Sequence, residues 1–358
     1  MASGSDSKLR WRLVDDEGSD RQAALFDGDQ LVDRHVGTGE FRGMEFLHVN
    51  ARTIINEVPA ASRMPFRFTI NAYRGCSHAC SYCFARPTHE YLGLDVGEDF
   101  ERKIVVKINA VERLRAELAG RRWAGHHIAM GTNTDPYQRC EGKYHLTRGV
   151  VEVLAEAANP FSILTKSTLI LRDLRLLAGA AARTDVRASL SIGTLDPAIW
   201  RLTEPGTPHP RQRVEAVRRL NQAGVPCGVL IAPILPGLSD REDQLEEVVR
   251  ASVDAGAVAI SSVALHLRPG VREHFLGQLD KTHPDWAAEY ERRYQRAYLP
   301  AAETQALSER VRRLVARARG RTGRDTTAHG GFRLETPPPA VSPPPPDAQL
   351  AFDLSATS

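Results

Sequence analysis

Three of the chain's five cysteines lie on one short stretch, Arg74–Ala85, with the spacing C-x3-C-x2-C. Cys76, Cys80 and Cys83 can point at one centre only if the backbone between them wraps around it, and thiolates are preferred ligands of Fe–S clusters and of zinc. A 4Fe-4S cluster normally takes four protein ligands, so three cysteines leave one iron open to another ligand. The spacing therefore predicts a metal centre with an open position, as in catalytic rather than closed structural sites.

The motif, with Tyr82 directly before its last cysteine, resembles the signature of the radical S-adenosylmethionine (radical SAM) superfamily. The resemblance implies a 4Fe-4S cluster on Cys76, Cys80 and Cys83 whose open iron binds the amino and carboxylate groups of S-adenosyl-L-methionine. It also implies one-electron cleavage of that cofactor to methionine and a 5′-deoxyadenosyl radical. The electron would come from a reductase or from a flavodoxin- or ferredoxin-type partner.

A zinc site is the alternative that the residues alone leave open. His78 or His89 would complete a Cys3His set, a common ligand set of structural zinc. Such a chain would be a non-catalytic, zinc-bearing nucleic-acid-binding protein. Its basic surface would be the stretch Glu291–Arg324, which has ten arginines against three glutamates.

The composition is that of an ordinary soluble protein with one large core or a barrel and its appendages. The chain has 358 residues, a net charge of +3 and an odd number of cysteines, and it starts with the polar run Met1–Asp6. These features point away from a disulfide-bonded secreted protein. No apolar run approaches the roughly 18 residues that cross a bilayer. We therefore expect a cytoplasmic protein with no membrane partner.

Strand and helix patterns alternate through the middle of the chain, which predicts an α/β fold with a parallel sheet. The family resemblance implies a partial (β/α)6 TIM-like barrel of the radical SAM type, with the cysteine loop after the first strand. The expected strands are 66–71, 127–131, 161–165, 186–192, 225–231 and 257–265, and the expected helices are 104–118, 146–157, 173–182, 210–223 and one from a Ser239-x-x-Glu242 capping box to Ala255.

The same patterns predict how the chain is divided. We expect a flexible leader and an N-terminal extension that packs on the core, then the barrel, a helical arginine-rich segment and a disordered proline-rich tail. Their ranges are 1–40, 41–65, 66–270, 271–325 (with an amphipathic helix over 301–320) and 326–358.

Barrel enzymes bind their ligands at the C-terminal ends of the strands, so the strand exits carry the candidate site residues. The resemblance implies that Thr134 and Asp135, after the second strand, bind the amino end of S-adenosylmethionine. It likewise implies that Lys166 faces the carboxylate, with Tyr82 and Ser191 completing the cofactor site. On sequence alone, Asp135 fits equally well a turn that leads into the next helix.

Several runs narrow the resemblance to the spore photoproduct lyase-like branch, whose members are often called DNA repair photolyases. The runs are Asn71–Cys76, Tyr82–Tyr91, Thr134–Tyr137, Thr165–Ser167 and Ala232–Gly237. The lyase opens thymine dimers and needs a cysteine at the second strand exit to return a hydrogen atom. Thr132 stands at that place here, and Phe84 replaces a redox-active tyrosine after the last cluster cysteine.

Cys140 lies eight residues after Thr132 and is the candidate catalytic replacement for the hydrogen donor, whereas Cys227 is expected to be an inert buried thiol. Damaged DNA is thus one candidate substrate, and RNA, a protein or a small molecule are the alternatives. Two peptides also resemble the glutamine-plus-hydrophobe motifs that bind the bacterial DNA sliding clamp, a second candidate partner. They are Gln22–Phe26 and Gln349–Phe352.

Overall fold

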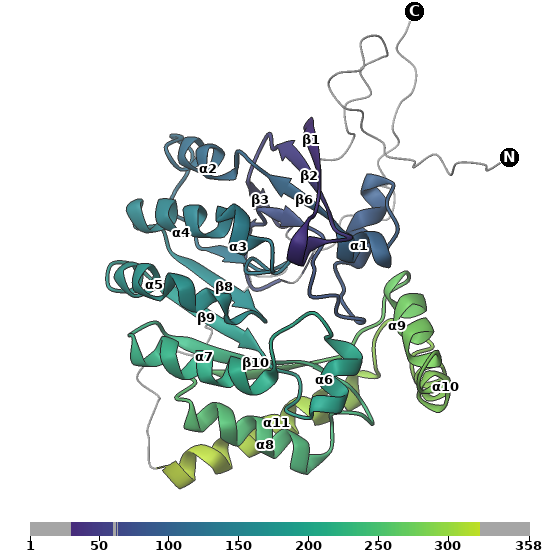
Figure 1. Ribbon diagram of the computed structural model, residues 1–358. Helices are drawn as coiled ribbons and strands as arrows, with labels where there is room; N and C mark the ends of the chain where they lie inside the picture. Colours follow the sequence, from purple (N-terminus) through teal and green to yellow (C-terminus); the bar gives the residue numbers. More distant parts are fainter. Residues whose placement is uncertain (1–29, 60–61, 63, 323–358) are drawn as a thin grey trace, which may run out of the picture.

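The computed structural model describes residues 30–59, 62 and 64–322, which form an α/β fold with two sheets (Figure 1). The main sheet has the strand order β11-β10-β9-β8-β7-β4-β3. Neighbouring strands from β4 to β11 pair in parallel, and β3 adds an antiparallel edge. The strands are β3 (Ile55–Glu57), β4 (Phe68–Ile70), β7 (Ile128–Met130), β8 (Phe161–Thr165), β9 (Val186–Ser191), β10 (Cys227–Ile234) and β11 (Ile260–Ala264).

Six parallel strands in chain order confirm the predicted partial (β/α)6 barrel. β11 and β3 are the two edges of the sheet, so the barrel is not closed in the described part of the chain. Figure 1 shows the helices that follow the strands stacked along one side of the sheet. They are α4 (Leu146–Glu156), α5 (Leu174–Ala181), α7 (Pro210–Gln222) and α8 (Glu242–Asp254).

Helix α7 shows why these segments are helical. Val214, Val217 and Leu220 recur at helical spacing and are buried against the sheet. Pro210 occupies the first turn, where its missing N–H costs no hydrogen bond. Gly224 ends the helix with φ +83°, a conformation that favours glycine. The predicted helix over 210–223 is confirmed to within one residue.

The prediction of one helix over 104–118 is wrong in its first part. Residues Lys103–Lys107 form strand β6, and helix α2 covers only Ala110–Leu118. Ile104, Val105 and Val106 are almost completely buried, and β-branched side chains favour a strand when neighbours cover both of its faces. β6 pairs with β2 (Glu45–Asn50) on one side and with β5 (Tyr73–Arg74) on the other, partners that local spacing does not reveal.

A second, smaller sheet with the order β1-β2-β6-β5 lies beside the first (Figure 1). Its edge strand β1 spans Gln30–Val36, so the predicted flexible leader over 1–40 reached too far, and its part before residue 30 lies outside the described residues. The predicted extension over 41–65 supplies β2 to the small sheet and β3 to the main sheet. The chain moves from β4 in the main sheet to β5 in the small sheet directly before Cys76.

The predicted capping box of α8 is also wrong. The helix begins at Glu242 after Arg241, not after Ser239. The Ser239 hydroxyl instead accepts a hydrogen bond from the Leu235 N–H at 2.9 Å, and the Ser239 N–H donates to the Leu235 carbonyl at 2.8 Å. The serine therefore closes the turn after β10, a local use of its hydroxyl that competes with helix capping.

Three helices follow β11: α9 (Val271–Asp280), α10 (Pro284–Arg293) and α11 (Ala301–Thr322). α11 packs on α8 and β11 and buries Leu307, Val311 and Leu314, as its apolar stripe predicts. Several of its arginines have intramolecular partners; Arg317, for example, pairs with Glu246 at 3.0 Å. No helix among the described residues is long and apolar enough to cross a membrane. The proline-rich tail and both clamp-like peptides lie outside the described residues.

Candidate active site

The three motif cysteines lie on the loop that connects β5 to the 3-10 helix η3 (Arg86–Leu92). All three are free thiols, with Cys76 and Cys80 buried and Cys83 half-buried. The Cys76 N–H donates to the Phe100 carbonyl at 2.9 Å, which ties the loop to α1 (Glu98–Arg102). Burial raises the pKa of each thiol, so a bound metal would displace protons from them.

Arg86 holds the loop in shape from inside the protein. Its guanidinium is fully buried and donates to the Cys80 carbonyl from Nε and Nη2, at 3.1 and 2.9 Å. The same group donates to the Val96 carbonyl and pairs with Glu101 at 2.5 Å. A buried cation with this many partners is a rigid brace, because each of its planar donors is used. Nothing in the sequence pattern singled out Arg86 for this role.

The segment 203–208 packs against the cysteine loop. The Gly206 N–H donates to the His78 carbonyl at 3.0 Å, and the Ser81 N–H donates to the Thr203 carbonyl at 3.0 Å. A Cβ atom on Gly206 would lie 2.3 Å from the Ser77 carbonyl oxygen. Glycine is therefore required where the two backbones touch.

The predicted residues Thr134 and Asp135 support the cysteine loop from the β7 exit. The Thr134 hydroxyl donates to the Gly75 carbonyl at 2.7 Å. The Asp135 carboxylate accepts from the Thr165 hydroxyl at 2.6 Å and from the Lys166 N–H at 2.7 Å, and it pairs with His78 at 3.3 Å. Burial opposes ionisation of this carboxyl most strongly, but His78 and these donors hold its pKa below the usual range.

Asp135 also accepts from the Tyr137 N–H at 2.9 Å, so the turn that the sequence left open is present as well. It is a positioning residue that joins the backbones of the β7 and β8 exits. It also holds His78 of the cysteine loop at the same place.

Lys166, Ser191 and Tyr82 meet at the centre of the site. The Lys166 ammonium donates to the Ser191 hydroxyl at 2.6 Å and to the Ala232 carbonyl at 3.2 Å, and it lies 5.6 Å from the centre of the Tyr82 ring. Its third partner is Glu204, at 3.2 Å. All three N–H donors of the lysine are used, so contact with the carboxylate of a ligand would replace one of these partners.

Glu204 and Arg213 complete this buried network and were missed as site residues from the sequence. Glu204 accepts from the Tyr82 hydroxyl and pairs with Arg213 at 2.5 Å, and the Arg213 guanidinium is fully buried. Burial opposes the charge of Glu204, but Arg213 and Lys166 outweigh it and lower the pKa of Glu204 to about 2. The sequence shows only two charged residues nine positions apart, and no local spacing predicts that they meet Lys166.

The donor set fits a cluster better than a single zinc ion. Four ligands around one zinc ion would bring sulfurs to about 3.8 Å of one another. In the described residues, however, the one group of three potential ligands whose ligand atoms lie within 4.8 Å of one another is Asp33, His35 and His48. His78 pairs with Asp135, and His89 is buried against the Lys103 carbonyl at 3.0 Å. The three cysteines and these two histidines thus do not bring their ligand atoms as close together as one zinc ion requires.

A cleft of about 600 Å³ opens beside the cysteine loop. It is bounded by the exits of β7 and β8 and by the segment 203–208, and its wall carries charged and hydroxyl groups. The lining residues are His78, Tyr137, Arg139, Ser167, Thr168, Leu169, Arg172 and Pro205–Pro208. None of the predicted cofactor residues lines the cleft, although Tyr137 and Ser167 of the same two strand exits do.

The two remaining cysteines are buried away from this network. Cys140 precedes α3 (Glu141–Tyr144) in the hydrophobic core, and its electrostatic neighbours are Tyr73, Glu141 and Tyr144. Cys227 lies inside β10 and is fully buried. Burial raises the pKa of both thiols, so both stay protonated near neutral pH. The Asn71 side-chain amide donates to the Thr132 hydroxyl at 3.1 Å, and that hydroxyl donates to Asn71 Oδ1 at 3.3 Å.

An exposed row of aromatic rings begins next to Cys83. The Phe84 and His266 ring centres are 6.0 Å apart, and His266 stacks on Tyr298 at 5.5 Å. Phe84 and Tyr298 are 47% and 55% exposed, so large apolar surfaces face solvent here. The Arg268 guanidinium donates to the Tyr298 hydroxyl at 2.8 Å. We call Phe84, His266, Tyr298 and Arg268 the aromatic ledge.

The open parallel barrel and the three free cysteines on the loop after β5 point to one class of protein. The family model described as "Radical SAM superfamily" matches residues 70–250, half of the chain. The chain therefore belongs to the radical SAM superfamily and is a radical SAM enzyme. The family implies a 4Fe-4S cluster, which Cys76, Cys80 and Cys83 would hold, and S-adenosylmethionine as the cofactor.

Two relatives that match the chain carry the description "uncharacterized protein". An uncharacterized protein of Mycobacterium tuberculosis (strain H37Rv), Rv2578c, is 44% identical over 287 residues, which cover 80% of this chain and 84% of that protein. The uncharacterized protein MJ0683 of Methanocaldococcus jannaschii is 29% identical over 202 residues, 56% of this chain and 71% of the relative.

Among solved structures, the fold is similar to that of spore photoproduct lyase complexed with dinucleoside spore photoproduct. The TM-score is 0.55 at 17% identity, over 76% of this chain and 79% of that one. A mutant of the same lyase gives a TM-score of 0.56 over the same shares. At this identity the likeness shows that the chain shares the fold of spore photoproduct lyase, and it shows the fold alone.

The Lys166→Met variant tests the cofactor role predicted for Lys166. Glu204 keeps Arg213 and Tyr82 in this variant, so the fold should survive. Loss of one charged hydrogen bond should weaken S-adenosylmethionine binding by about 10- to 100-fold. Equilibrium dialysis of the cluster-loaded protein measures it, with the exposed Lys281→Met as a control that keeps wild-type affinity. An unchanged affinity in Lys166→Met would remove Lys166 from the ligand set.

Proposed function

We propose that the enzyme directs its radical to a nucleic-acid lesion of the thymine-dimer type. The observation that supports this proposal most is the aromatic ledge beside Cys83, in which Phe84 and Tyr298 are exposed and Arg268 lies at the end. Aromatic rings and guanidinium groups at a surface are the means by which proteins stack unpaired bases. The likeness to a lyase complexed with a dinucleoside lesion supports the same substrate class.

The site residues divide the work in this proposal. Cys76, Cys80 and Cys83 would hold the cluster, which would supply the electron for reductive cleavage of S-adenosylmethionine. Tyr82, Lys166 and Ser191 orient the methionine part of the cofactor, and Thr134 and Asp135 hold the strand exit at its amino end. The buried ion pairs of Glu204 fix the lysine. The barrel keeps water away from the reacting carbon, which limits side reactions of the radical.

Cys140 is the proposed hydrogen donor that ends the reaction. A donor must carry its hydrogen, and burial keeps this thiol protonated. Because the side chain has no exposed surface, it acts only if substrate binding exposes Cys140 while Thr134 and Asp135 keep their contacts. A reductase or a flavodoxin- or ferredoxin-type protein would supply the electron, and a DNA sliding clamp is a further proposed partner.

Ultraviolet-damaged DNA and the Cys140→Ala variant test this proposal together. Incubation with wild-type enzyme, S-adenosylmethionine and dithionite should lower the number of lesions in the damaged DNA and restore intact thymines. Undamaged DNA should show no change in its thymines. Cys140→Ala should still release 5′-deoxyadenosine but accumulate unfinished product. Cys227→Ala, equally buried, is the matched control and should behave as wild type.

The outcomes separate the parts of the proposal. If damaged DNA leaves the lesion count and the rate of 5′-deoxyadenosine release unchanged, the substrate assignment is wrong while the enzyme class stands. The same assay with RNA, protein extract or small-molecule pools then identifies the class. If Cys140→Ala gives the wild-type product, Cys140 is not the donor.

A further inference from the structure

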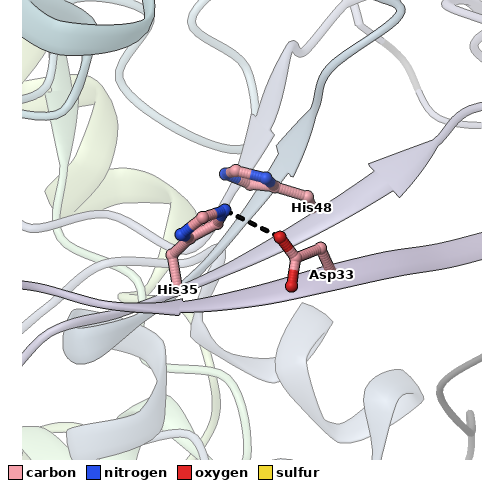
Figure 2. A group of neighbouring side chains, drawn as sticks. All are labelled: Asp33, His35 and His48. Atoms are coloured by element: carbon pink, nitrogen blue, oxygen red, sulfur yellow. Dashed lines mark ion pairs between the residues drawn. The ribbon is translucent and has the colours of Figure 1, made fainter.

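A group of three metal-ligating side chains lies on the small sheet, far in sequence from the cysteine loop. Asp33 and His35 belong to β1, and His48 belongs to β2. Residues two apart on a strand point to the same face, and Asp33 is directly opposite His48 in the antiparallel register. Figure 2 shows the three side chains converging on one face of the hairpin.

The ligand atoms of these residues are already close together. One oxygen or nitrogen from each lies within 4.8 Å of the other two. His35 Nε2 is 2.8 Å from Asp33 Oδ2, and the two imidazole rings lie 4.4 Å apart between centres. An ion needs only small side-chain movements to contact all three. Asp33 and His35 have half of their side-chain surface exposed, so an ion can enter from solvent.

Tyr144 prepares His48 as a ligand. Its hydroxyl is 2.8 Å from His48 Nε2, which leaves Nδ1 as the nitrogen available to a metal. A hydrogen bond on the second ring nitrogen fixes the orientation and tautomer of a metal-bound histidine.

We propose that Asp33, His35 and His48 form a site for a divalent transition-metal ion of the zinc class. Two imidazoles and one carboxylate are a set that zinc accepts, with water in the remaining position. Imidazole ligands disfavour magnesium and calcium, which take oxygen ligands. β1 is the edge strand of the small sheet and pairs only with β2 among the described strands. The ion would therefore cross-link this edge and stabilise the hairpin.

Zinc uptake by the cluster-loaded protein tests the site, because the cluster then occupies the cysteines that also bind zinc. Equilibrium dialysis against micromolar zinc, with iron content matched between preparations, should give one zinc per chain in wild type. His35→Ala and His48→Ala should each lose that zinc, and Tyr144→Phe should bind it about tenfold more weakly. His283→Ala changes an exposed histidine elsewhere and should keep it.

A second readout separates binding from misfolding. Zinc should raise the thermal unfolding midpoint of wild type and of His283→Ala, and should leave that of His35→Ala unchanged, because only a native state with the site is stabilised by the ion. Magnesium should shift none of them. Equal zinc uptake in wild type and His35→Ala, or no uptake beyond the iron-deficient fraction of wild type, would overturn the proposal. His35 is exposed enough that its variant should fold even if His48→Ala does not.

Discussion

Replacing Cys80 with alanine should leave a protein that retains no 4Fe-4S cluster after reconstitution and releases no 5′-deoxyadenosine above the level of a protein-free control. Cys76 and Cys83 cannot hold three corners of a cluster, and Cys140 and Cys227 are buried elsewhere and cannot replace the missing thiolate. The measurements are iron and sulfide per chain, the visible absorbance, and chromatography of the reaction with dithionite and S-adenosylmethionine.

Cys227→Ala is the control for Cys80→Ala, since it also removes one buried thiol. It should keep the full iron content and wild-type cleavage, which would show that the loss in Cys80→Ala comes from the ligand position. A Cys80→Ala protein that holds a stable cluster and cleaves the cofactor at the wild-type rate would contradict the assignment of the three ligands.

Replacing Glu204 with alanine should lower the free energy of unfolding by about 3–5 kcal/mol, the usual cost of leaving a buried charge without its partner. Arg213 is fully buried and Lys166 is mostly buried, so neither can turn to solvent when the carboxylate is removed. Denaturant unfolding under anaerobic conditions measures the change. Glu57→Ala breaks an exposed pair with Arg67 and should cost about 1 kcal/mol or less.

The same network predicts how stability depends on pH. The pKa of Glu204 is about 2 in the folded protein and near 4.5 in the unfolded chain, so the unfolded state binds the proton first. Its contribution is fully present above about pH 4.5 and is lost as pH falls from there toward 2, by about 3 kcal/mol in total. Glu204→Gln should remove this part of the acid dependence. A Glu204→Gln profile parallel to wild type would contradict the paired, ionised state of Glu204.

The order of the strand–helix units was predictable because each unit has its own local pattern of apolar residues and its own helix-end residues. α7 shows this well, with buried residues at helical spacing between Pro210 and Gly224. The cysteine loop and the residues at the β7 and β8 exits could be placed for the same reason, since parallel strands end at one edge of the sheet.

The elements that were missed depend on contacts between distant parts of the chain. Strand β6 follows a helical spacing in sequence, and becomes a strand because β2 and β5 pair with it on both sides. Glu204 gives no signal until the fold brings Lys166 and Arg213 to it. Arg86 likewise resembles a surface arginine in sequence but braces the Cys80 carbonyl from the interior. Charged residues that pair across a fold have no fixed separation in the sequence, so only the folded structure reveals them.

Anaerobic reconstitution of the full chain, followed by reduction in the presence of S-adenosylmethionine, tests the central claim most directly. Cys76, Cys80 and Cys83 should hold a cluster with a broad absorbance at the blue edge of the visible, and dithionite should then release 5′-deoxyadenosine and methionine in equal amounts. A fully loaded cluster that releases neither product, or a chain that takes one zinc at the cysteines and no iron, would contradict it.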